Sequence, residues 1–127
     1  MAPTPYTPKL LTVRTLGEAE AALRTVNCEE EGVRLMANKC ILEVIKLHGV
    51  RNAIANILKQ EMLAVGADAA VSKDTINCKD PATDVVLMAT LKQYLKVIAK
   101  MKGQVSECRD VANAIHAALS SKHKKLA

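Results

Sequence analysis

The sequence predicts one small α/β domain, and three observations support this fold class. The chain has 127 residues, a length that suits one domain. Half of its residues are hydrophobic, so we expect a folded core. Apolar residues recur at helical spacing in some segments and form short, continuous, strand-like runs in others. We therefore predict a small open sheet, mixed or mostly parallel, of four to five strands with helices packed on it.

The first half of the chain alternates between strand and helix patterns. Residues 9–14 are short and β-branched and predict a first strand, followed by a helix over residues 17–26. Residues 33–39 are ambiguous, and we expect a loop with one helical turn. Residues 40–47 form the clearest strand pattern, and residues 51–65 form the clearest helix. The buried stripe predicted for that helix is Ile54, Leu58, Met62 and Val65.

The second half of the chain continues the alternation. Residues 67–71 and 74–78 predict a strand or a short hairpin pair, and residues 79–84 form the most evident loop. The remaining elements are a doubly buried strand over 85–89, a helix over 91–102 capped by Thr90, and a helix that begins at Ser106. Because strands and helices alternate, we expect parallel strand pairs joined by crossover helices.

The ends of the chain differ in composition from its middle. Three prolines fall within residues 1–8, which predicts a flexible N-terminus, and residues 9–120 are expected to form the single domain. Residues 121–127 are expected to form a basic C-terminal tail. Its three lysines account for three of the five net positive charges. The rest of the chain therefore has a small net charge, which is usual for a folded domain.

The sequence carries no targeting or metal-binding signal that we can identify. It has no apolar run long enough for a transmembrane helix and no secretory signal, so we expect a cytoplasmic protein without membrane association. Its four cysteines include no C-x-x-C pair, and its three histidines complete no zinc pattern. We therefore expect free thiols, no metal and no cofactor.

The motifs of common catalytic sites are also missing. The sequence has no G-x-S-x-G, H-E-x-x-H, P-loop or G-x-G-x-x-G motif. His48, at a strand exit, is the best single candidate for a general base. A partly exposed histidine at a strand end explains it more simply. We therefore predict no catalytic residues, and a chain that is not an enzyme by itself.

Polar side chains on two helices are candidates for binding. Asn52, Asn56, Lys59 and Gln60 share one side of the helix over 51–65 and could bind a polar heterocycle or a carboxylate. An ordinary solvated helix face would have the same pattern. Thr90 lies where a strand meets a helix N-terminus, which favours anions, although it could simply cap the helix.

Two segments carry a resemblance to a known family. They are residues 50–70, which include the run A-N-I-L-K-Q-E-M-L, and residues 84–93. Together they resemble the accessory region that precedes the barrel in some bacterial and archaeal dihydropteroate synthases, a resemblance that extends over residues 32–102. The matching positions are Lys39, Asn56, Lys59, Gln60, Gly66, Asp84, Thr90 and Gln93. The resemblance implies ligand- or partner-binding roles for Lys39, Asn56, Lys59, Gln60, Thr90 and Gln93.

The resemblance implies a function in pterin or folate-type cofactor metabolism, without the synthase activity. Residues from Gln104 onward predict a closing helix instead of the pterin-binding barrel, and Ala89 stands where the family usually has glycine. We therefore expect a free-standing, non-catalytic accessory domain that binds a pterin-binding barrel protein or a pterin or folate-type ligand. A homodimer is also compatible with this fold class. The alternative is a small basic nucleic-acid-binding domain, against which the near absence of aromatic residues counts.

Overall fold

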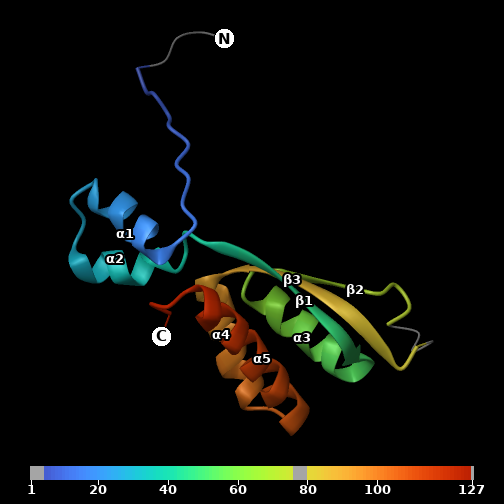
Figure 1. Cartoon of the computed structure of the whole chain (residues 1–127). Coiled ribbons are helices and arrows are strands. Elements are labelled where there is room, and N and C mark those ends of the chain that lie inside the picture. Colours follow the sequence, from blue (N-terminus) through green and yellow to red (C-terminus); the bar gives the residue numbers. More distant parts are fainter. Residues whose placement is uncertain (1–4, 76–79, 127) are drawn as a thin grey trace.

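The computed structural model describes residues 5–75 and 80–126 of the chain. Within these residues it contains five helices and three strands, arranged as Figure 1 shows. In chain order they are α1 (Leu16–Arg24), α2 (Glu30–Ala37), β1 (Leu42–Arg51), α3 (Asn52–Ala64), β2 (Asp68–Val71), β3 (Ala82–Thr90), α4 (Leu91–Lys102) and α5 (Ser106–Lys122). The α/β class is confirmed, and no helix of the described residues is long and apolar enough to cross a membrane.

The prediction of a four- to five-stranded, mixed or mostly parallel sheet is wrong. The described residues form a three-stranded sheet in the order β1-β3-β2, and both strand pairs are antiparallel. Since β1 and β2 each run opposite to β3, they run in the same direction as each other. The unit β1-α3-β2 is therefore a crossover between like-directed strands, but the expected parallel pair does not form. Its two strands are separated because β3 lies between them.

The strand count differs because residues 9–14, and the part of residues 74–78 that the structure describes, belong to no strand. Residues 9–14 carry no secondary structure, and Asp74 and Thr75 lie in a turn; the rest of the predicted strand over 74–78 lies outside the described residues. The predicted loop over 79–84 also differs, because β3 already begins at Ala82. A β-branched pattern favours extended backbone, but a strand needs a neighbour for its N–H and C=O groups.

Helices α3, α4 and α5 lie on one side of the sheet, and no helix of the described residues covers the other side (Figure 1). The core lies between these layers and is almost entirely aliphatic, with Tyr94 as its one aromatic side chain. Strand β3 contributes Val85, Leu87 and Ala89, which are all buried. The helical predictions over 51–65 and 91–102 are confirmed within two residues at each end. The ambiguous segment 33–39 belongs mostly to helix α2.

Helices α1 and α2 form a pair at one end of the molecule, near the start of β1 (Figure 1). Helix α1 begins at a capping box in which Thr15 and Glu18 bond each other's backbone N–H groups. The C-terminal residues lie against this pair: Lys125 donates a hydrogen bond to Glu20 over 2.8 Å, and Leu126 packs against the core. The C-terminal end of the described chain therefore lies against α1.

Candidate functional site

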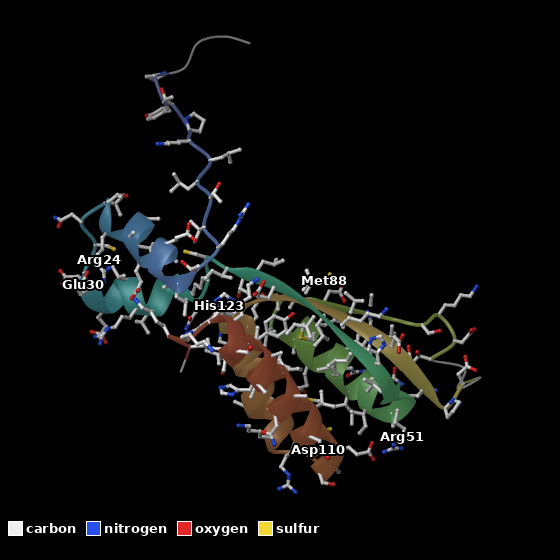
Figure 2. The ribbon with its side chains drawn as sticks, in the orientation of Figure 1. Arg24, Glu30, Arg51, Met88, Asp110 and His123 are labelled. Carbon is white, nitrogen blue, oxygen red and sulfur yellow. The ribbon has the colours of Figure 1, made fainter. Side chains whose placement is uncertain are left out.

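The uncovered face of the sheet carries exposed aliphatic side chains. Side chains alternate between the two sides of a strand, so Leu42 and Val44 of β1 point away from the helices and are 62% and 64% exposed. The register places Val44 beside Met88 of β3 and Val86 beside Ala70 of β2. Figure 2 shows Met88 on the side of the sheet opposite the helices. We call these five residues the open face.

A β-bulge closes one end of the open face. Two residues of β1, His48 and Gly49, lie opposite the single residue Asp84 of β3. The backbone N–H of Gly49, at φ +63°, donates to Asp84 Oδ1 over 3.0 Å, and His48 Nδ1 lies 3.4 Å from Asp84 Oδ2. These contacts, the Gly49 bond first, hold the pKa of Asp84 below its usual range. His48 is 75% exposed, so the pair is screened by water.

Three of the six predicted binding residues make contacts that hold the fold around the turn between α3 and β2. Thr90 and Gln93 form the capping box of α4, and the Gln93 side-chain amide also donates to the Val65 carbonyl over 3.0 Å. Lys59 donates to the Ala69 carbonyl over 2.6 Å and to Asp68 over 3.2 Å. Side-chain bonds of this kind explain the positions of these residues by structure, and their role in binding stays a prediction.

The other predicted residues lie in two places. Asn56 and Gln60 are exposed on α3 and line a groove of about 350 Å³ with Glu61 and Gln104. Lys39 is exposed in the turn before β1, which the bond from the Lys92 N–H to the Asn38 carbonyl attaches to the start of α4. Asn52 does not share the exposed side of α3. It is buried and donates to the Asp80 carbonyl.

A buried polar cluster ties the C-terminus to β1. His123 Nε2 lies 2.8 Å from Glu43 Oε2, Lys122 Nζ lies 2.9 Å from the same oxygen, and the Tyr94 hydroxyl donates to the Glu43 carbonyl over 2.8 Å. Burial raises the pKa of Glu43, but the bonds from His123 and Lys122 outweigh it and leave that pKa below its usual range. Burial raises the pKa of Tyr94. These contacts attach the C-terminal residues to β1. The spacing of the residues in the sequence did not predict these contacts.

A pocket of about 320 Å³ lies beneath the second half of β1, between the start of α3 and the first turns of α5. Its rim includes His48, Arg51, Glu107 and Asp110. The sequence indicated His48 but not the other three, because residues 51 and 107 meet only when α5 folds back against β1. Among the described residues, no group of three or more His, Cys, Asp or Glu side chains could hold a metal ion.

Comparisons with known proteins find similarity to parts of two larger enzymes. The chain is 30% identical over 100 residues to a bifunctional dihydropteroate synthase/dihydropteroate reductase of Helicobacter pylori, covering 79% of this chain and 26% of that protein. It is 33% identical over 93 residues to a probable bifunctional folylpolyglutamate synthase/dihydropteroate synthase of Halobacterium salinarum, covering 72% of this chain and 11% of that protein.

These similarities agree with the resemblance seen in the sequence, at the level of a shared segment. No protein-family model matches the chain, and no solved structure matches it. The chain spans about a quarter of the first relative and about a tenth of the second. Most of this chain is therefore similar to a minor part of two enzymes whose names both include dihydropteroate synthase.

Proposed function

We propose that this chain is a non-catalytic accessory domain that docks onto a dihydropteroate synthase catalytic domain through its open face. The observation that carries the proposal is the one-sided sheet. A sheet buries an apolar face against a second layer, and here only one face is covered. Leu42, Val44, Val86 and Met88 lie on this side of the sheet, together with Lys46 of β1, which lies opposite Val86. Exposed apolar surface of this kind is typical of an interface.

The comparisons support the choice of the proposed partner. Both relatives include dihydropteroate synthase in their names, and in both the matched segment is joined to a much longer chain. A segment that is part of a larger enzyme has neighbouring domains to contact. An open aliphatic sheet face offers the surface for such a contact, which would link this chain to pterin and folate-type metabolism.

The chemistry at the surface supports binding more than catalysis. The exposed His48–Asp84 pair lies in water, where neither group is desolvated in the way that catalytic acids and bases are. Asn56 and Gln60 offer free amide groups beside the groove on α3 and would bind a pterin or folate-type ligand or the partner's polar rim. Thr90, Gln93 and Lys59 would support the binding surface by holding the turn that follows α3, and Lys39 would add a positive charge at a separate place, before β1.

Isothermal titration of the purified chain with a dihydropteroate synthase catalytic domain from the same organism tests the proposal. We expect a complex with a dissociation constant of about 10 μM or lower. Val44→Glu and Met88→Glu each place a charge in the proposed interface and should weaken binding by at least about tenfold. The matched control is Leu63→Glu, which alters an aliphatic side chain of α3 that is 51% exposed and outside the open face. It should leave binding unchanged.

Two further titrations separate partner binding from ligand binding. Dihydropterin pyrophosphate and reduced folates are titrated into the chain alone and into Asn56→Ala and Gln60→Ala variants. Binding that these variants weaken would support the polar part of the proposal. If the synthase, the pterin and the folates all fail to bind the folded chain, the proposed function has no basis. Equal loss of synthase binding in Leu63→Glu and Met88→Glu would also overturn the docking surface.

A further inference from the structure

Helix α4 carries a row of lysines on the side opposite its buried stripe. Lys92, Lys96 and Lys100 follow one another at intervals of four residues. Residues four apart lie one above the other on a helix, and the rise per residue spaces them about 6 Å apart. Lys39 continues the row, because the Lys92 N–H donates to the carbonyl of Asn38 over 3.0 Å. We call Lys39, Lys92, Lys96 and Lys100 the lysine row.

The charges of the lysine row are poorly compensated by the rest of the fold. Helix α4 contains no acidic residue, so its lysines repel one another at this spacing. Lys92 also lies in the first turn, where the positive end of the helix dipole disfavours a cation. Among the described residues, only Lys100 of this row has an acidic partner, with Nζ 3.9 Å from Glu61 Oε2. A bound chain of negative charges would therefore relieve repulsion that the fold leaves in place.

A positively charged pocket lies beyond Asn38 and continues the lysine row. Its volume is about 370 Å³, and it is lined by Leu16, Glu20, Arg34, Ala37, Asn38 and Lys125. Lys125 donates a hydrogen bond to the Glu20 carboxylate over 2.8 Å, so these two charges compensate each other. Arg34 is exposed and forms no ion pair with any residue that the structure describes. The pocket therefore keeps one positive charge that suits an anionic group.

We propose that this pocket and the lysine row together bind a linear chain of carboxylates. An end carboxylate would pair with Arg34, and the following ones would pair with Lys39, Lys92 and Lys96 in turn. The inference goes beyond the accessory role proposed above, because it requires neither the open face nor a synthase partner.

Glutamyl chains have the spacing that the lysine row requires. A γ-linked chain has five backbone bonds per residue and therefore carries one carboxylate about every 6 Å when extended. An extended α-linked chain directs alternate side chains to the same side, about 6.6 Å apart. A single-stranded nucleic acid is the competing polyanion, but its bases need aromatic side chains on which to stack. The chain has no Phe or Trp, Tyr94 is buried, and Tyr6 lies in the N-terminal segment.

The probes are α-linked and γ-linked hexaglutamate, titrated into the ¹⁵N-labelled full chain and followed by amide chemical shifts. We expect saturable shifts at Lys39, Lys92 and Lys96, with a dissociation constant of about 1 mM or lower. Raising the salt concentration from about 50 mM to about 500 mM should weaken binding, because exposed charges are screened. Hexaglutamine, which has the same length without the charges, should not bind.

The outcomes of these titrations separate the possible sources of the carboxylates. Binding of both hexaglutamates supports recognition by spacing alone, and binding of one assigns the linkage. Binding of neither would overturn the proposal. Equal or tighter binding of a six-nucleotide oligothymidylate would overturn the choice of carboxylates and assign the row to nucleic acid.

Charge-matched variants test the placement. The Lys92→Gln/Lys96→Gln double variant should weaken hexaglutamate binding by about tenfold, since two ion pairs are lost. Its matched control is Lys9→Gln/Lys102→Gln, which removes the same charge elsewhere: Lys102 is exposed on α4 but lies about a third of a turn away from Lys96. The control should bind normally. Equal weakening in both double variants would show attraction by net charge alone and would overturn the site.

Two further measurements distinguish this proposal from effects on folding and from synthase docking. The thermal midpoint of Lys92→Gln/Lys96→Gln should equal or exceed that of wild type, because repulsion on α4 is reduced. A lower midpoint would contradict the uncompensated charge from which the proposal starts. Met88→Glu, which tests docking through the open face, should leave hexaglutamate binding unchanged, so the two proposals can fail separately.

Discussion

The two faces of the sheet carry similar aliphatic side chains in opposite surroundings. Leu87 and Met88 are neighbours on β3; Leu87 is fully buried beneath the helices, whereas Met88 lies on the open face. The hydrophobic effect stabilises the fold only where folding removes the side chain from water. The covered face therefore holds the domain together. An aliphatic face left in water contributes little to stability and is available for an interface.

Each face also carries one contact between a carboxylate and a histidine. On the covered face, Glu43 and His123 lie 2.8 Å apart with side chains 17% and 2% exposed. On the open face, Asp84 and His48 lie 3.4 Å apart with side chains 54% and 75% exposed. Both carboxylates have a lowered pKa. Only the first pair is protected from water, so only this pair should contribute strongly to stability.

We expect the largest difference in stability between variants of Leu87 and Met88, the two neighbours on β3. Leu87→Ala removes a fully buried side chain from the covered face and should lower the free energy of unfolding by about 3 kcal/mol. Met88→Ala removes a side chain of similar size from the open face and should cost less than about 1 kcal/mol. Urea denaturation followed by circular dichroism measures both. Equal losses would show that the open face is already covered in solution, for instance by a second copy.

A smaller effect should appear in the dependence of stability on pH. The pKa of Glu43 is lowered by folding, so its contribution is complete above the usual range of glutamate and disappears as the pH falls through the lowered pKa. Glu43→Gln should lower the free energy of unfolding by about 2 kcal/mol near pH 7. This difference in stability from wild type should become smaller as the pH falls below the usual pKa range of glutamate.

The matched variant for the pH experiment is Asp84→Asn on the open face. Because the Asp84 side chain is exposed, Asp84→Asn should lower the free energy of unfolding by less than Glu43→Gln does at every pH. Denaturation midpoints measured from pH 3 to pH 8 provide the comparison. A larger loss in Asp84→Asn than in Glu43→Gln would contradict the assignment of the stabilising pair to the covered face.

The smallest effect concerns the bulge that ends the open face. A Cβ atom at Gly49 would meet no atom within 4 Å, so Gly49→Ala should act only through its backbone conformation at φ +63°. We expect a loss of about 1 kcal/mol. Gly103→Ala, at the end of α4 and at φ −83°, is the control and should change stability by less than about 0.5 kcal/mol. Thermal unfolding measures both, and a neutral Gly49→Ala would show that the bulge relaxes without cost.

Local patterns predicted the helices well and the sheet less well. Helix α4 begins and ends where Thr90, the apolar stripe and Gly103 indicate, because caps and periodicity act within one element. The strand predicted over residues 9–14 depends on a partner strand, and a sequence pattern does not reveal whether one exists. The same limit applies to strand pairing: the alternation of strands and helices predicted parallel pairs, and it does not reveal that β3 lies between β1 and β2 and pairs with both in the antiparallel sense.

The candidate sites show a similar division. Asn56 and Gln60 were found because residues three or four apart share a helix face. For Thr90, Gln93 and Lys59, the same reasoning could not show that their side chains bond the Val65 and Ala69 carbonyls and the α4 cap. The open face could have been anticipated from Leu42 and Val44 in alternation with Glu43 and Ile45, but only if one side of the sheet were known to lack helices.

The sequence by itself determined the α/β class, the helices other than α2 and the segment that resembles dihydropteroate synthase relatives, because these depend on local periodicity and on residue identity. Tertiary structure alone decided the antiparallel order, the open face and the joining of Arg51 to Glu107 and of Glu43 to His123. Each of these joins residues far apart in the chain. Their contact depends on how whole layers pack, a property that no short window of sequence contains.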